Sequence, residues 1–177
     1  MIENILDKIV KVKTLEVESR KINNVFPEYI CNTSRSFYNA LKKGGPSIIA
    51  EVKRSSPSRG LIRVDFDVEQ IASVYRHYAR AVSVLTDSEF FGGSHEFLKI
   101  VSDRIYQPVL CKDFIIDKYQ IYEARSYGAH AILLIVAILT DSQIRDFLKI
   151  SHSLGMDCLV EVHDEAELER ALRADAR

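Results

Sequence analysis

Two hydrophobic patterns alternate along this chain: short continuous apolar runs, and longer stretches in which apolar residues recur every three or four positions. The continuous runs are typical of buried β-strands, and the periodic stretches are typical of helices that bury one face. The pattern predicts strands at residues 48–53, 81–86, 108–114, 131–139 and 158–163. It predicts helices between and after them, at residues 67–80, 94–105, 117–130, 141–155 and 164–172.

Residues with capping propensity mark the ends of these helices. Ser94 stands where an N-cap is expected, and Gly128 and Gly155 stand where a left-handed residue would end a helix. Asp164 is followed three residues later by Glu167, which resembles a capping box with aspartate as the cap. These local signals agree with the boundaries that the periodicity predicts.

Strands that alternate with helices predict βα units and a parallel sheet, and nearly continuous hydrophobic strands indicate that both of its faces are covered. Two architectures fit, an open doubly wound sheet and a closed TIM (β/α)8 barrel. Neither a GxGxxG nor a GxxxxGK[ST] motif follows the first strand, which disfavours nucleotide-binding open sheets. We therefore expect a single domain of the α/β class, in which residues 47–177 form about the first five βα units of a partial barrel. Residues 1–46 are expected to add a helical extension, with a helix from Ile2 to about Lys21, a loop containing Pro27 and a short helix from Ser36 to Lys43.

Charged residues stand near the downstream ends of the first, third and fifth strands. In the stretch IIAEVKRSSPSRG (48–60), the two-residue period of a strand places Glu51 and Lys53 on one face. Lys112 stands near the end of the third run and Glu161 near the end of the fifth. Barrel enzymes carry their chemistry at this end, so we expect the four side chains to converge there as a proton-transfer set. A structural arrangement stays open, in which Glu51 pairs with a lysine and Glu161 is solvated.

The composition narrows the classes of function. The chain has 177 residues, 47% of them hydrophobic and 28% charged, and its formal net charge of -1 gives no electrostatic argument for nucleic acid or a membrane surface. The longest apolar run, residues 131–139, is far shorter than the roughly 20 residues that span a bilayer. Three cysteines (Cys31, Cys111 and Cys158) are odd in number and lack metal-ligand spacing. We expect reduced thiols in a cytoplasmic protein, with no metal site.

Five stretches together point to a known family. IIAEVKRSSPSRG, VLTDSEFFGG, PVLCKDFIID, ILLIVAIL and CLVEVHDEAELERAL, in this order and spacing, closely resemble the indole-3-glycerol phosphate synthase family. The resemblance implies a TIM-barrel carboxy-lyase of tryptophan biosynthesis that uses no metal or organic cofactor. Its substrate would be a phosphorylated small molecule, 1-(2-carboxyphenylamino)-1-deoxyribulose 5-phosphate, and its products indole-3-glycerol phosphate, CO2 and water.

The resemblance also implies roles for the charged residues. Lys112 matches the general acid that protonates the ketone oxygen, and Lys53 matches the lysine that holds the carboxylate on the substrate ring and has an acid role in the dehydration. Glu161 matches a proposed general base. Glu51 matches a carboxylate that orients the lysines or the substrate.

Two further positions match substrate contacts in the family. Ser56 matches a phosphate contact, and Phe91 matches an aromatic residue that lines the pocket for the substrate ring. By composition alone, the Ser-Pro-Ser stretch is more typical of a turn, and Phe91 would equally suit a packed core.

The family continues beyond the length of this chain, into strands that carry further catalytic and phosphate-binding groups. We therefore expect the chain alone to have little activity and to self-associate or capture a complementary C-terminal fragment through its open sheet edges. Two classes of function stay open, a lyase and a non-catalytic half-barrel. A phosphoribosylanthranilate isomerase is disfavoured, because these strand ends lack the Cys/Asp pair that it uses.

Overall fold

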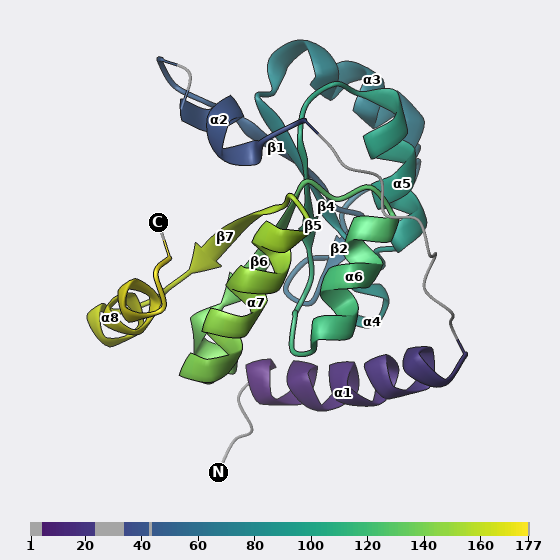
Figure 1. The fold of residues 1–177 in the computed structure, drawn as a ribbon. Coiled ribbons are helices and arrows are strands. Elements are labelled where there is room, and N and C mark those ends of the chain that lie inside the picture. The colour runs from purple at the N-terminus through teal and green to yellow at the C-terminus, as the bar shows by residue number, and fades with distance from the viewer. Residues whose placement is uncertain (1–4, 24–33, 43, 177) are drawn as a thin grey trace.

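A five-stranded parallel sheet forms the centre of the molecule (Figure 1). The computed structural model describes residues 5–23, 34–42 and 44–176. The strands lie in the order β1-β4-β5-β6-β7, so each strand pairs with the next parallel strand along the chain. This order, with a helix after each strand, is that of a partial (β/α)8 barrel, and it confirms the predicted fold class. The strand bounds are β1 (Ile49–Val52), β4 (Ala81–Leu85), β5 (Val109–Lys112), β6 (Ala131–Ile135) and β7 (Asp157–Glu161).

Helices cover the outer face of this sheet, and the main core lies between the two layers. Val84, Cys111, Ile132 and Leu134 from the strands are buried against helical residues such as Leu98. Because apolar residues on both layers lose water together, this contact supplies most of the hydrophobic stabilisation. The helices are α3 (Val68–Tyr78), α4 (Ser88–Phe91), α5 (His95–Arg104), α6 (Lys118–Ser126), α7 (Asp141–Ser153) and α8 (Glu165–Arg173).

The predicted helix caps are present, with one change. Ser94 accepts a hydrogen bond from the backbone N–H of Glu96, and Gly128 and Gly155 adopt positive φ angles of 89° and 69°. Asp164 accepts from the N–H of Glu167, as a capping aspartate should. The reciprocal bond of a capping box is absent, because the Glu167 carboxylate accepts from the N–H of the residue before the cap.

The fourth predicted strand is shorter than expected. Its pairing ends at Ile135, and a 3-10 helix, η1 (Val136–Ile138), replaces the rest of the 131–139 run. The carbonyls of Val136 and Leu139 accept hydrogen bonds from Arg170 on α8. The run is continuously apolar because it is buried, and a distant arginine satisfies the backbone groups that leave the sheet.

The helix α2 (Phe37–Lys42) closes the concave face of the sheet at the N-terminal ends of the strands. Phe37 packs against Ala81, Leu110 and Ala131, which form a second small core on this face. The Asp157 carboxylate accepts hydrogen bonds from the residues on either side of Phe37. Phe37 and its neighbours therefore cover the concave face near the N-terminal ends of the middle strands.

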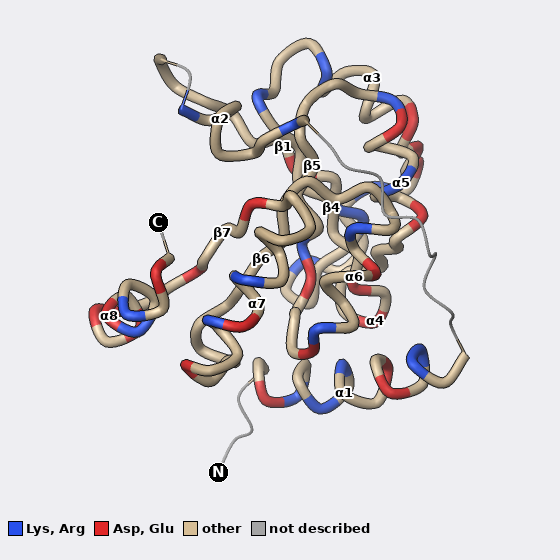
Figure 2. The backbone as a smooth tube through the Cα atoms, in the orientation of Figure 1, with Lys and Arg blue, Asp and Glu red and all other residues tan. Residues whose placement is uncertain are grey.

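The helix α1 (Ile5–Asn23) lies across the C-terminal ends of the strands, next to α6 (Figure 1). The two helices of the N-terminal extension thus lie at opposite ends of the sheet, α1 at the C-terminal ends of the strands and α2 at their N-terminal ends. Ile2, Pro27, Cys31 and Lys43 lie outside the described residues. Basic and acidic residues are interspersed along α1 and α8 (Figure 2). No helix in the described part of the chain is long and apolar enough to cross a membrane.

Candidate active site

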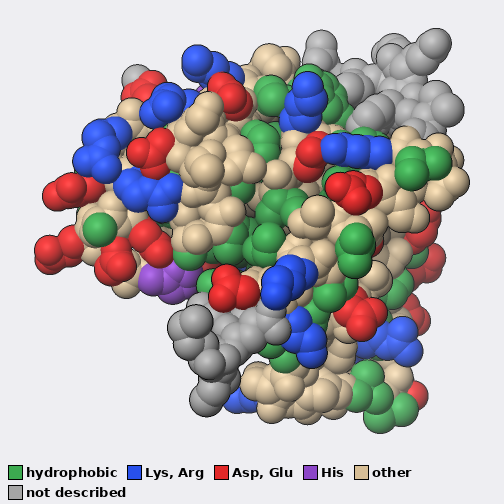
Figure 3. Space-filling model, turned by 90° about the horizontal axis from the view of Figure 1, so that it is seen from below, with side chains coloured by type: hydrophobic (Ala, Val, Ile, Leu, Met, Phe, Trp, Pro, Cys, Tyr) green, Lys and Arg blue, Asp and Glu red, His purple; other side chains and the backbone are tan. Residues whose placement is uncertain are grey.

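A cavity of about 180 Å³ opens at the C-terminal ends of the strands. Viewed from this end, the surface shows hydrophobic side chains surrounded by acidic and basic groups (Figure 3). The cavity is lined by five of the six residues predicted from the sequence: Glu51, Lys53, Phe91, Lys112 and Glu161. The structure therefore brings together side chains that lie up to one hundred and ten positions apart in the sequence.

The strand register explains this convergence. Leu85 of β4 is opposite Lys112 of β5, and Ile135 of β6 is opposite Glu161 of β7. Residues directly opposite each other on neighbouring strands face the same side of the sheet, and all four of these residues line the cavity. Lys53 directly follows the last residue of β1. The strand ends thus present charge above an apolar floor that includes Leu85, Leu133 and Ile135.

Glu51 lies between the two lysines. One carboxylate oxygen is 2.6 Å from Lys53 Nζ, and the other is 2.6 Å from Lys112 Nζ. Partial burial disfavours the charged carboxylate, but the hydrogen bonds from Lys112 and Lys53 outweigh it and lower the pKa of Glu51. Glu51 therefore does pair with lysine, as the purely structural alternative expects. These ion pairs lie inside the cavity, where the three side chains are 26–36% exposed. We call Lys53, Glu51 and Lys112 the cavity triad.

Glu161 lines the same cavity from β7, at the other edge of the sheet from β1, and has different partners. Its carboxylate lies 3.2 Å from His163 Nε2, while His163 Nδ1 lies 3.2 Å from Glu167. The side chains of Glu161 and His163 are 40% and 55% exposed, so water reaches both. Glu161 is thus solvated, as the structural arrangement expects, but it also lines the same cavity as both lysines.

Ser56 is the predicted residue that does not line the cavity. It belongs to a short hairpin of β2 (Ser55–Ser56) and β3 (Gly60–Leu61), and its hydroxyl accepts a hydrogen bond from the N–H of Arg59. The Ser-Pro-Ser stretch is therefore a turn, as its composition favours. A phosphate contact at Ser56 stays a prediction.

Phe91 reaches the cavity from the short helix α4. Its ring lies 6.1 Å from that of Phe114, centroid to centroid, and both rings line the cavity. Asp87 caps this helix, accepting hydrogen bonds from the N–H groups of Phe90 and Phe91 at 2.7 and 3.2 Å. After the helix, Gly93 lies so close to β4 that a Cβ there would stand 2.3 Å from the carbonyl oxygen of Leu85. The cap and the close approach together fix the position of Phe91.

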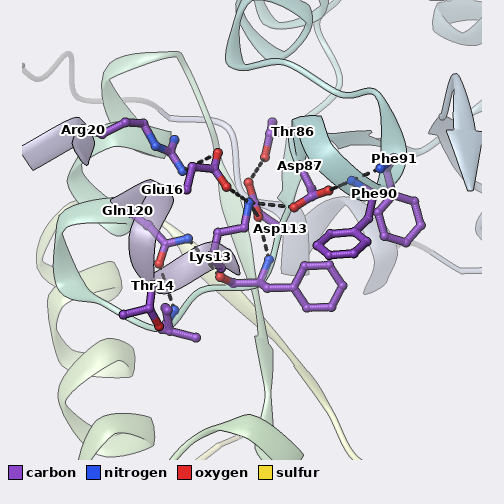
Figure 4. Close-up of polar contacts among 12 residues, drawn as sticks. Lys13, Thr14, Glu16, Arg20, Thr86, Asp87, Phe90, Phe91, Asp113 and Gln120 are labelled. Carbon is purple, nitrogen blue, oxygen red and sulfur yellow. Dashed lines mark hydrogen bonds and ion pairs between the residues drawn. The ribbon is translucent and has the colours of Figure 1, made fainter. Parts of the chain in front are cut away.

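A second ion cluster joins α1 to the segments that follow β4 and β5 (Figure 4), and its member Asp113 also lines the cavity. Lys13 of α1 has no exposed side-chain surface, and its Nζ lies 2.7 Å from Asp87, 2.9 Å from Asp113 and 2.8 Å from Glu16. Burial opposes the charge on the ammonium, but Asp113 and Asp87 outweigh it and raise the pKa of Lys13. Burial likewise opposes ionisation of Asp113, yet Lys13 and a hydrogen bond from Thr86 lower its pKa. We call Lys13, Asp87 and Asp113 the buried triad.

Further ion pairs connect the neighbourhood of the buried triad to α6. Arg20 of α1 pairs with Glu123 at 2.7 Å and with Glu16 at 3.0 Å. Glu123 also lies 3.7 Å from His95 Nε2. Burial, aided by the positive charges of Arg20 and Lys13, lowers the pKa of His95 to about 4. His95 is therefore neutral near pH 7.

A larger hollow of about 480 Å³ lies between α6 and α7, lined by Asp117, Gln143, Asp146 and Lys149 among others. It is open and does not bring buried charges together, so the cavity at the strand ends is the better candidate. Among residues 5–23, 34–42 and 44–176, no group of three or more His, Cys, Asp or Glu side chains could hold a metal ion. Cys111 and Cys158 are free thiols, and burial raises their pKa values to about 12 and about 11.

The sequence analysis missed the buried triad, although signals for it exist. Ile9, Lys13 and Val17 are spaced four apart and form the buried stripe of α1, so Lys13 occupies a position where an apolar residue is expected. Asp113 directly follows the last residue of β5, and Asp87 comes two residues after the last residue of β4. A lysine in an apolar stripe, together with two strand-end aspartates, is the pattern that indicates a buried ion cluster.

Comparison with known proteins places the chain in a family. It is 49% identical to the tryptophan biosynthesis protein TrpCF of Haemophilus influenzae, over 98% of this chain and 36% of that protein. It is 47% identical to TrpCF of Salmonella typhi over 99% and 39%, and 46% identical to TrpCF of Buchnera aphidicola subsp. Diuraphis noxia over 99% and 40%. The chain thus spans 36–40% of the length of these relatives. The model of the family described as indole-3-glycerol phosphate synthase matches residues 6–177, and the chain belongs to that family.

Proposed function

We propose that this chain carries the proton-transfer groups of an indole-3-glycerol phosphate synthase. The reaction would close, decarboxylate and dehydrate 1-(2-carboxyphenylamino)-1-deoxyribulose 5-phosphate. The observation that carries the proposal is the cavity triad: two ammonium groups share one carboxylate, in a solvent-accessible cavity that Glu161 and Phe91 also line.

Ring closure forms a bond between the ring carbon that bears the carboxylate and the ketone carbon, and negative charge develops on the ketone oxygen. In the proposed mechanism Lys112 stabilises this oxygen and protonates it. Lys53 holds the ring carboxylate until it leaves as CO2. The former ketone oxygen then leaves as water, with Lys53 as the proposed acid and Glu161 as the proposed base that removes a proton.

Glu51 fits the role of an internal counter-ion in this scheme. In the free protein it holds both ammonium groups at 2.6 Å and keeps them at a fixed separation. A substrate carboxylate would replace Glu51 as a partner of Lys53, so the lysine would keep an anionic partner throughout binding. Exchanging one carboxylate for another avoids leaving an unpaired charge in a partly buried site.

The cavity is of a size to hold the reacting part of the substrate and not the whole molecule. Its volume of about 180 Å³ is below the roughly 300–1,000 Å³ of typical ligand sites. It would enclose the aromatic ring and the ketone, with the phosphorylated tail extending outward. We propose that Ser56 and the hairpin of β2 and β3 contact that tail. We also propose that the protein acts in the cytoplasm, where Cys111 and Cys158 stay reduced.

The sheet edges suggest how the site is completed. In the described part of the chain, β1 and β7 each pair with one strand only, and Ile49 and Leu159 on these strands are 38% exposed. Unpaired strand edges with exposed apolar side chains favour association. We propose that a further polypeptide segment, either a second copy or a complementary C-terminal segment, pairs with these edges.

Formation of the fluorescent indole product tests the function. The purified chain is given the substrate alone, and in parallel with the segment of the Haemophilus influenzae relative that follows the matched region. We expect product at least in the second sample, together with a complex detected by light scattering. A stable complex that forms no product would contradict the lyase proposal and favour a non-catalytic half-barrel.

A further inference from the structure

The contacts of Lys13 extend beyond the attachment of α1. The same helix already has two ion pairs to its neighbour α6, Arg20 with Glu123 and Lys21 with Asp117. Lys13 instead reaches the two segments that follow β4 and β5, where Asp87 and Asp113 lie (Figure 4). Both segments carry groups that line the cavity, but Lys13 itself does not line it.

On the β5 side, Asp113 is the residue after Lys112. Its carboxylate accepts hydrogen bonds from the Thr86 hydroxyl at 2.7 Å and from the N–H of Phe114 at 2.8 Å, in addition to pairing with Lys13. Every one of these contacts restricts the backbone on the C-terminal side of Lys112. A shift of Asp113 would therefore displace the ammonium of Lys112 relative to a bound ketone.

On the β4 side, Asp87 uses its two carboxylate oxygens differently. Oδ1 caps α4 through the N–H groups of Phe90 and Phe91, whereas Oδ2 pairs with Lys13 at 2.7 Å. The helix α4 has only four residues, too few to be stable without its cap and tertiary contacts. The position of Phe91 thus depends on a carboxylate whose other oxygen is held by Lys13.

We propose that Lys13 is a positioning residue for the ring-closure site, holding the segment that carries Phe91 and the segment that follows Lys112 at a fixed separation. The proposal rests on the proposed function for its kinetic consequence, but its structural part does not. One buried ammonium between two carboxylates is a rigid link, because any separation of the three groups leaves an unpaired charge away from water. The ring of Phe91 against that of Phe114 marks the place where the two segments meet.

The test compares Lys13→Met and Lys13→Arg with Lys21→Met in the full chain, prepared as in the product assay. Lys21→Met is the matched control, because it removes another α1 ion pair whose two side chains are 40% and 31% exposed. We expect Lys13→Met to lower kcat about 10- to 100-fold with a smaller change in KM, since misplacing a group that acts in the transition state falls mainly on kcat. Lys13→Arg should give a smaller loss, because a planar guanidinium keeps the charge but not the geometry.

Amide hydrogen exchange supplies a readout that does not depend on activity. The N–H groups of Phe90, Phe91 and Phe114 are held by Asp87 and Asp113, so we expect faster exchange at these amides in both Lys13 variants but not in Lys21→Met. If Lys13→Met does not fold, Lys13→Arg decides. Folded Lys13 variants with kcat and amide protection equal to those of Lys21→Met would overturn the proposal. If the unmodified protein forms no product, the proposed function fails, while the exchange rates still decide the role of Lys13.

Discussion

The cavity triad and the buried triad both lie at the C-terminal ends of the strands, where Asp113 of the buried triad also lines the cavity, but their charges are arranged inversely. In the cavity triad one carboxylate holds two ammonium groups whose side chains are 33% and 36% exposed. In the buried triad one ammonium with no exposed surface holds two carboxylates at 1% exposure. Water can exchange protons with the first cluster, whereas the second is a fixed set of charges. The comparison separates charges available for chemistry from charges that hold the fold.

The largest effect that would test this separation is expected in the cavity triad. Lys112→Met removes the proposed general acid, and we expect the rate of ring closure to fall about 10²- to 10⁴-fold. The measurement is indole product formation in the preparation that shows activity. Lys118→Met, an exposed lysine at the start of α6, is the control and should keep its rate. Unchanged turnover in Lys112→Met would remove this lysine from the mechanism.

A smaller effect, on stability, is expected in the buried triad. Lys13→Met leaves the carboxylates of Asp87 and Asp113 buried without their shared cation, and we expect the free energy of unfolding to fall by about 3 kcal/mol. The matched change is Glu51→Gln, whose ion pairs are partly solvated, and it should cost less than about 1 kcal/mol. Urea denaturation of both variants measures the difference. Equal losses would mean that exposure does not distinguish the two clusters.

The smallest expected effect is a loss of stability at acidic pH, caused by His95 near the buried triad. Burial lowers its pKa to about 4, so between the ordinary value near 6.5 and pH 4 the unfolded chain binds a proton that the folded chain does not. The free energy of unfolding should therefore fall as the pH falls through this window, by at most about 1.4 kcal/mol per pH unit for this histidine. His130, whose pKa burial lowers to about 3, adds to the same trend.

The contribution of His95 is measured by comparing thermal unfolding at pH 7 and pH 5. We expect His95→Gln to lose less stability on acidification than the unmodified protein. His152→Gln, at an exposed position on α7, should behave like the unmodified protein. An identical pH dependence in all three proteins would show that His95 is not held neutral by its surroundings.

Much of the fold was accessible from the sequence because local pattern and tertiary environment agree. Continuous apolar runs gave the five strands, and Ser94, Gly128 and Gly155 marked helix ends that the structure confirms. The prediction was wrong where contacts with a residue distant in the sequence determine the local structure. The end of β6 depends on Arg170, which donates to carbonyls more than thirty positions away, and no local pattern reports that contact.

The candidate site divides in the same way. Lys112 and Glu161 could be found because a charge at the end of an apolar strand is a local signal of a strand-end site. Lys13 could not be placed from one segment alone, because its partners lie on two other segments, and its meaning depends on all three. Ser56 was proposed from the resemblance, and the structure places it in the hairpin of β2 and β3, outside the cavity.

Phe37 packs on the concave face near the N-terminal ends of β4, β5 and β6, and so separates the buried part of these strands from the part that faces the cavity. Leu110 packs against Phe37, whereas Lys112, two residues further along β5, lines the cavity. Two residues on the same face of one strand therefore have different surroundings: Leu110 is packed in a buried core, and Lys112 is partly exposed to solvent in the cavity. A substitution near the N-terminal end of a strand should therefore be tested for its effect on stability, and one near the C-terminal end for its effect on activity.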